Sequence, residues 1–173
     1  MTDAPASAAA TIRGDVIFDA AGRNTGGFRN EVTVSRPNGL PGEVYELPTD
    51  EGPGHGGNSS APYPLAYFTS ALTACVMVQL RAFARRMRIE VQDINVNTRC
   101  HWERVQQGSA PYVSAPVAFT MDIELGPDVA EADQRRLLAA AEKGCFIEAA
   151  LKPGVMRHRL KIKDHWVEVR SAP

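Results

Sequence analysis

The longest periodic pattern of hydrophobic residues in the chain starts near Pro64 and continues to Met87. Its apolar positions follow steps of three and four residues: Leu65, Phe68, Leu72, Cys75, Val76, Leu80, Phe83 and Met87. This spacing marks one face of an amphipathic α-helix, and a proline suits the first helical turn. Cys75 belongs to the apolar stripe, so we expect its thiol to face the core.

The same region requires a decision between a core helix and a membrane span. No charged residue occurs between Asn58 and Leu80, and a span needs about 20 apolar residues. The window nevertheless contains two prolines, three serines and two threonines, together with Asn58 and Gln79. These polar residues favour a buried core helix and predict no membrane partner.

Short runs with β-branched residues predict strands on both sides of this helix. Before it we expect strands at 11–18, 31–35 and 43–47, with turn-forming residues at 20–27 between the first two. After it, alternating apolar positions predict a strand hairpin of 90–102 and 112–125. A last alternating run, 155–169, predicts a single closing strand.

Two further helices are predicted between the hairpin and the closing strand. Asp128 and Glu131 have the spacing of a capping box, and a helix from 129 ends at Gly144, a typical C′ residue. Cys145 then opens a short helix that extends to 151. The order β-β-β-α-β-β-α-α-β, with neighbouring strands joined as hairpins, predicts an α+β fold with antiparallel sheets.

Composition limits the remaining choices. The chain has 173 residues, a net charge of −1 and 23% charged residues, which suits one globular domain and gives no basic excess for binding nucleic acid. Residues 1–10 have no basic region and read as a disordered lead-in, with a single domain over 11–173. Three cysteines without a CxxC repeat indicate a reducing compartment, and so a cytoplasmic protein.

The cysteines are the candidate chemistry. Cys75 and Cys145 each lie on a predicted helix that faces the core, and if those helices touch, the thiols form a redox pair. A position in the first turn of a helix would favour thiolate at Cys145. The plainer alternative is two buried, inert thiols. Cys100 next to His101 lacks further ligands at suitable spacing, so we predict no metal and no cofactor.

Two segments carry a resemblance to a known family. The run Gly-Gly-Asn-Ser-Ser-Ala-Pro-Tyr-Pro-Leu before Cys75 resembles the lead into the central helix of OsmC/Ohr proteins, the osmotically inducible and organic hydroperoxide resistance proteins. The segment 144–154, which begins Gly-Cys-Phe-Ile, is similar to that family's Gly-Cys-Pro-Val segment. The resemblance extends over roughly residues 11–169 and rests on the ordered pair of cysteines in matching contexts.

The resemblance implies an intertwined homodimer with curved antiparallel sheets around long central helices. It also implies a thiol-dependent peroxidase that reduces organic hydroperoxides. Cys75 matches the attacking cysteine and Cys145 the resolving one, and an external dithiol resets the pair. Such chemistry passes through a sulfenic acid and a disulfide. Arg23 and Arg29 are candidates for the arginine that orients the peroxide.

The chain departs from the family pattern at two places. Leu65 and Ala66 occupy the positions where the family has a glutamate that anchors the arginine, and Phe146 replaces the proline after the second cysteine. The departures imply a slow peroxidase. The alternative is a non-catalytic OsmC-like dimer that binds an apolar small molecule at the subunit interface. In either case the expected lining is apolar and aromatic, from Tyr63, Tyr67, Phe68 and Phe146.

Overall fold

In the computed structural model, which describes residues 11–169, the chain divides after Pro64 into two units. The N-terminal unit is a three-stranded antiparallel sheet in the order β1-β2-β3. Its strands are β1 (Asp19–Gly26), β2 (Arg29–Ser35) and β3 (Val44–Glu46). A short 3₁₀ helix, η1 (Pro53–His55), lies in the glycine-rich loop that follows.

The first strand is not where the sequence predicts it. Residues 11–18 form no strand, and β1 occupies the segment predicted as a turn. The chain instead reverses at Gly26 and Gly27, which have φ angles of +123° and +56°. These angles suit glycine. β1 is formed by pairing with β2, as in the register of Arg23 with Glu31.

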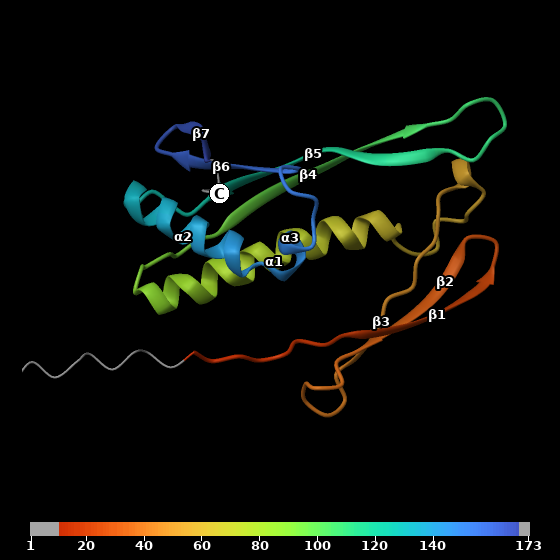
Figure 1. The fold of residues 1–173 in the computed structure, drawn as a ribbon, viewed down its shortest axis with the longest axis horizontal. Coiled ribbons are helices and arrows are strands. Elements are labelled where there is room, and N and C mark those ends of the chain that lie inside the picture. The colour runs from red at the N-terminus through yellow and green to blue at the C-terminus, as the bar shows by residue number, and fades with distance from the viewer. Residues whose placement is uncertain (1–10, 170–173) are drawn as a thin grey trace, which may run out of the picture. The chain divides into compact units, whose positions relative to one another are not determined.

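The C-terminal unit places its helices against one face of a four-stranded sheet (Figure 1). α1 (Pro64–Met87) matches the predicted central helix. The sheet has the order β4-β5-β6-β7, and its strands are β4 (Asn95–Val105), β5 (Val113–Glu124), β6 (Met156–Ile162) and β7 (His165–Val169).

Two predictions about this sheet are wrong. The closing strand predicted over 155–169 is a hairpin, because the chain turns at Lys163, a non-glycine residue with φ +53°. The sheet is also mixed, since β5 and β6 run parallel. The connection between them contains α2 (Glu131–Gly144) and α3 (Phe146–Ala149), as a parallel pair requires a long crossover.

The predicted capping box at the start of α2 is wrong as well. Its N-cap is Ala130, and no side chain caps it. The side chain of Gln134 instead turns back, and its Nε2 donates to the carbonyl oxygen of Val129 at 2.8 Å.

The core lies between the sheet and the helices of the C-terminal unit. The stripe predicted on α1 is buried at Leu72, Val76 and Leu80, and α2 contributes Leu137 and Leu138. The facing strands supply alternate residues: Phe119, Met121, Ile123, Leu160 and Ile162. This alternation is what a sheet with one covered face requires.

α1 is long and apolar enough to cross a membrane by length and composition, a test that core helices of soluble proteins also pass. Only 17% of its most hydrophobic window is buried in the protomer. The buried part is the stripe against the sheet, whereas Leu65 and Val78 are exposed. α1 therefore packs as a core helix on one side and leaves apolar surface on the other.

Candidate active site

The structure brings together the two cysteines that the sequence pairs. Cys75 lies on α1, and Cys145 lies at the corner where α2 ends and α3 begins. The thiols lie close enough for the Cys75 side chain to contribute to the raised pKa of Cys145, and all three cysteines of the chain are free thiols. The two thiols differ in access: Cys75 is half-buried, and Cys145 is fully buried.

Burial decides the protonation of Cys145. It raises the pKa of this thiol to about 12, assisted by the Cys75 thiol and opposed by the backbone N–H of Glu148, which donates to Cys145 Sγ at 3.4 Å. The sequence argument that the helix start would favour thiolate at Cys145 is therefore wrong. At neutral pH Cys145 is a thiol, and its S–H is available as a donor to the Cys75 sulfur.

Gly144 permits the close approach of α2 to α1 next to Cys145. A Cβ at this position would lie 2.5 Å from the ring of Phe83 on α1 and 3.3 Å from Gln79 Oε1. Gly144 is the last residue of α2, and the extended Cys145 is the C-cap. A glycine is therefore needed here because a side chain would collide with α1. It does not have the C′ role that the sequence suggests.

A buried group of three ionisable residues lies beside Cys145. His158 on β6 is 1% exposed and contacts Glu142 of α2, with Nδ1 to Oε1 at 2.9 Å. Its Nε2 is 3.3 Å from Glu148 Oε1 of α3. Desolvation alone would lower the pKa of His158, but the two carboxylates outweigh it and raise the pKa to about 9. At neutral pH the group is an imidazolium between two glutamates.

Cys100 is separate from this pair. It lies on β4, and its thiol contacts the side chain of Thr69, six residues before Cys75 on α1. Six helical residues span about 9 Å. Burial raises the pKa of Cys100, with Thr69 opposing. Within residues 11–169 no cluster of potential ligands could hold a metal.

The two candidate arginines belong to the N-terminal unit and differ in how they are held. Arg29 opens β2, and its Nε donates to Glu31 Oε1 at 2.8 Å. Its NH1 donates to the carbonyl oxygen and the hydroxyl of Ser60, at 2.9 and 3.0 Å. Arg23 lies exposed on β1 and forms no ion pair with any residue in the range 11–169. Glu31 thus anchors an arginine although the family position of the glutamate holds Leu65.

Asp50 organises the loop that positions Ser60. This buried carboxylate accepts hydrogen bonds from the backbone N–H groups of Glu51, Asn58 and Ser60, and from the Ser60 hydroxyl at 2.7 Å. The bonds from Ser60 contribute most, and the pKa of Asp50 falls to about 2. Asp50, Ser60, Arg29 and Glu31 form one connected polar network.

The four predicted lining residues have different surroundings. Phe68 packs edge-on against Trp102 and Phe119, with ring centroids 5.7 and 5.9 Å away. Phe146, next to Cys145, is exposed. Tyr67 is half-buried, and the Tyr63 hydroxyl lies against Gly52. Phe68 is therefore part of the protomer's interior.

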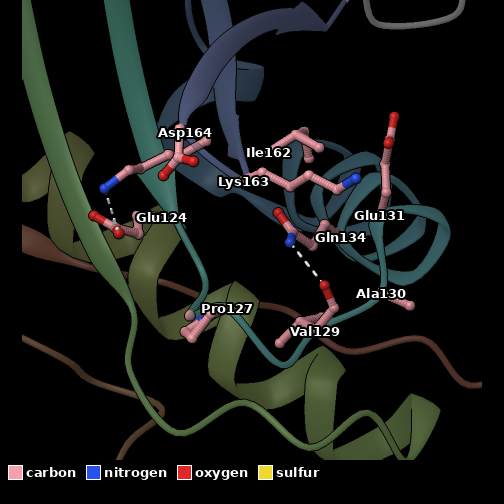
Figure 2. A pocket seen from close by; sticks show the side chains of 11 residues that line it. Glu124, Pro127, Val129, Ala130, Glu131, Gln134, Ile162, Lys163 and Asp164 are labelled. Carbon is pink, nitrogen blue, oxygen red and sulfur yellow. Dashed lines mark hydrogen bonds and ion pairs between the residues drawn. The ribbon is translucent and has the colours of Figure 1, made fainter.

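A cavity of about 590 Å³ lies away from the thiols, around the start of α2 and the β6–β7 turn (Figure 2). Its lining includes Glu124, Gln134, Lys161 and Asp164, but none of the cysteines and none of the four predicted lining residues. Lys161 pairs with Glu124 at 2.8 Å. The chemistry suggested by the thiols is not located in this cavity.

Sequence reasoning missed five residues that hold the candidate groups: Glu31 and Asp50 in the N-terminal unit, and Glu142, Glu148 and His158 in the C-terminal unit. The available signals were weak. Glu142 and Glu148 precede and follow Cys145 by three residues, and His158 occupies a core position of an alternating strand. A histidine on the same strand face as the apolar Met156 and Leu160 indicates a buried group that needs partners, but no local pattern identifies which glutamates supply them.

Comparison with known proteins identifies the family and the fold. A family model described as OsmC-like protein matches residues 55–169. An OsmC-like hydroperoxide resistance protein from Jannaschia sp. CCS1 is 39% identical, with 89% of this chain and 98% of that chain covered and a TM-score of 0.51. No curated protein matches the chain.

More distant crystal structures share the fold. An organic hydroperoxide resistance protein OsmC from Legionella pneumophila is 17% identical, with 88% of this chain and 98% of that chain covered and a TM-score of 0.56. One from Vibrio cholerae, with captopril bound in one of its active sites, is 18% identical, with coverages of 92% and 97% and a TM-score of 0.56. The α+β fold is thus that of the hydroperoxide resistance proteins.

Proposed function

Since this chain belongs to the OsmC-like protein family, we propose that it is a thiol-dependent peroxidase that reduces organic hydroperoxides with Cys75 and Cys145. The observation that carries the proposal is the proximity of the two thiols, one half-buried and one fully buried. An attacking cysteine must be reached by its substrate, whereas a resolving cysteine needs to reach only its partner. The difference in burial suits these two roles.

The proposed reaction has three steps. The Cys75 thiolate attacks the terminal oxygen of the hydroperoxide, so that an S–O bond forms, the O–O bond breaks and the alkoxide leaves as an alcohol after taking a proton. The Cys145 sulfur then attacks the sulfenic acid. An S–S bond forms, and the hydroxyl departs as water with the proton of Cys145. An external dithiol reduces the disulfide and is itself oxidised.

The protonated state of Cys145 suits this order of events. Because burial raises the pKa of Cys145 to about 12, this thiol keeps its proton at neutral pH and can donate a hydrogen bond to the Cys75 sulfur. A hydrogen bond donated to a thiolate stabilises its charge. The resolving thiol would thereby assist the first step before taking part in the second.

We further propose that Arg29, and not Arg23, orients the peroxide. The Arg29 guanidinium is held by the Glu31 carboxylate and by the carbonyl and hydroxyl oxygens of Ser60. A guanidinium held in one geometry loses less entropy when it binds an anionic oxygen. Glu31 would therefore take over the anchoring role that the family glutamate has elsewhere.

The working form is proposed to be a homodimer. Within residues 11–169, every buried hydrophobic residue lies between Leu72 and Ile162, so the N-terminal sheet contributes none. Apolar side chains of the N-terminal unit are exposed: Val16, Ile17, Phe18, Phe28, Val44 and Tyr45. A second copy of the chain would cover such surface and that of α1, and permanent interfaces bury about 2,000 Å² or more.

One observation favours the alternative, a non-catalytic dimer that binds an apolar small molecule. Leu65 occupies the position of the family glutamate and is exposed, which gives an apolar surface where peroxidatic members carry a charge. In that case the thiols would be packing groups. The two functions differ in whether the thiols turn over peroxide.

Consumption of cumene hydroperoxide in the presence of dithiothreitol tests the proposal. The wild type should show slow turnover, and Cys75→Ser should abolish it because the attacking sulfur is lost. Cys100→Ser is the matched control and should retain the wild-type rate, since Cys100 contacts Thr69 instead of the pair. Equal rates for the wild type and Cys75→Ser would reject the peroxidase and favour the binding protein.

A further inference from the structure

We propose that His158 is a positioning residue for Cys145: its ion pairs with Glu142 and Glu148 hold the α2–α3 corner so that the Cys145 thiol faces Cys75. The proposal rests on the proposed function only in taking Cys75 and Cys145 as a redox pair. His158 acts through its contacts with Glu142 and Glu148, the two glutamates that flank Cys145.

The geometry joins three elements at one point. Glu142 comes from the last turn of α2, Glu148 from α3, and His158 from β6. The imidazole lies between the two carboxylates, with contacts of 2.9 and 3.3 Å. A single side chain of the sheet is thus tied to both helices that meet at Cys145.

The same two glutamates hold the backbone and the sulfur of Cys145. The Cys145 N–H donates to the Glu142 carbonyl oxygen at 3.4 Å, and the Glu148 N–H donates to Cys145 Sγ at 3.4 Å. Any shift of Glu142 or Glu148 therefore moves Cys145 directly. The ion pairs fix the side chains of the residues whose main chains hold the cysteine.

Burial makes these ion pairs sensitive to the loss of one member. The side chains of His158, Glu142 and Glu148 are 1%, 8% and 14% exposed. Removing one partner of a buried ion pair leaves a charge without compensation. Without the imidazolium, two carboxylates would face each other in the interior and separate. The raised pKa of His158 agrees with a cation held at this point.

Disulfide formation depends strongly on the placement of the second thiol. Two cysteines can be bridged only within a narrow range of distance and direction, and a misplacement of about 1 Å can reduce the rate of a positioned reaction by roughly a hundredfold. Cys145 lies outside regular helix, at the extended residue between α2 and α3. An external tie to the sheet is therefore needed to hold its direction.

The test measures the Cys75–Cys145 disulfide in glutathione redox buffers, which require no peroxide chemistry. For His158→Gln we expect the equilibrium constant for disulfide formation to fall about tenfold, which raises the reduction potential by about 30 mV. Glu148→Gln keeps the ion pair of His158 with Glu142, and it serves as a second variant in case His158→Gln does not fold. Its equilibrium constant for disulfide formation should fall several-fold. Each variant is measured as folded protein, with its melting temperature recorded separately.

Arg159→Gln is the matched control. Arg159 is the next residue on β6 and pairs with Asp122 on the opposite face of the sheet, so its loss removes an ion pair from the same strand without touching the corner. Its potential should equal that of the wild type. A lowered melting temperature with an unchanged potential in both His158→Gln and Glu148→Gln would show a purely structural role and overturn the proposal.

A second readout separates this proposal from the peroxidase. Trapping of the sulfenic acid in a Cys145→Ser background reports the rate of the first step, and His158→Gln should leave this rate unchanged. The rate of disulfide closure reports the second step, and His158→Gln should lower it about tenfold or more. Equal closure rates would count against the positioning role. If peroxide fails to oxidise Cys75, the peroxidase is rejected, and the glutathione measurement still decides on His158.

Discussion

Each of the two units of the chain is stabilised internally by a different kind of interaction. In the C-terminal unit, buried apolar residues of α1, α2, β5 and β6 form a continuous core. Among residues 11–64 of the N-terminal unit the buried residues are polar or glycine, and the structure depends on the hydrogen bonds that Asp50 accepts and on strand pairing. A sheet that buries no apolar face is not expected to be stable alone.

The difference assigns separate tasks to the two units. The C-terminal unit positions two thiols with a packed core and a buried ion cluster, and it can do so within one protomer. The N-terminal unit presents an anchored arginine and exposed apolar side chains. We infer that the first unit determines the redox pair, whereas the second becomes ordered and functional through association with another copy. The following predictions test this division, starting with the largest expected effect.

Association should be essential for the N-terminal unit and for the solubility of the chain. Val78, which is 62% exposed on α1, should be covered in a homodimer, so Val78→Glu would place an unpaired charge in the interface. We expect loss of the dimer and of most soluble protein. Light scattering should give twice 18.8 kDa for the wild type. Gln107→Glu, which adds the same charge in an exposed loop, should remain dimeric, and an 18.8 kDa wild type would contradict the assembly.

The C-terminal unit should become less stable as the pH rises into the alkaline range. The pKa of His158 is about 9 in the folded chain against 6.5 for the ordinary side chain. The contribution of protonated His158 to the free energy of unfolding is therefore fully present below about pH 6.5 and is lost as the pH rises through about 9. Its size is on the order of 3 kcal/mol at 1.36 kcal/mol per pH unit. Urea unfolding across this range measures it, and a wild-type slope retained in His158→Gln would argue against His158 as its source.

The approach of α2 to α1 should depend on Gly144. Gly144→Ala would place a methyl group 2.5 Å from the Phe83 ring, and we expect a loss of about 1–3 kcal/mol from overpacking, together with slower closure of the Cys75–Cys145 disulfide. Gly14→Ala is the control, since nothing lies within 4 Å of a Cβ there. Denaturant unfolding gives the free energy, and unchanged stability in Gly144→Ala would show that Phe83 can move aside.

The smallest expected effect concerns the contribution of the N-terminal unit to turnover. Arg29→Gln should lower kcat/KM for cumene hydroperoxide about tenfold, or roughly 1.4 kcal/mol, because the anchored guanidinium is lost. Arg23→Gln should have little effect, since Arg23 is exposed and is not held by Glu31 or Ser60. The reverse ranking of the two variants would transfer the orienting role to Arg23.

The sequence predicted best where periodicity is long. α1 and its buried stripe follow directly from the spacing of its apolar residues, and the thiol pair follows from that stripe together with the Gly-Cys segment. β1 was misplaced because its residues are small, polar and exposed, so pairing with β2 determines the strand and propensity does not. The β6–β7 turn was invisible because Lys163, and not glycine, takes the left-handed conformation.

The polar parts of the site could not be predicted for a different reason. Each of Glu142, Glu148 and His158 is ordinary in its local sequence, and they meet only because the crossover between β5 and β6 returns β6 beside the α2–α3 corner. Glu31 likewise anchors Arg29 at a position unrelated to the family glutamate. Interactions between residues distant in sequence depend on the fold, so a pattern of residues does not reveal them.

The central claim is that Cys75 and Cys145 form the working redox pair. Peptide mapping after exposure to one equivalent of cumene hydroperoxide tests it most directly, with Cys145→Ser analysed in parallel. The account predicts a Cys75–Cys145 disulfide in the wild type and a trapped sulfenic acid at Cys75 in the variant. A disulfide to Cys100, or free Cys75 in both proteins after the peroxide has been added, would contradict it.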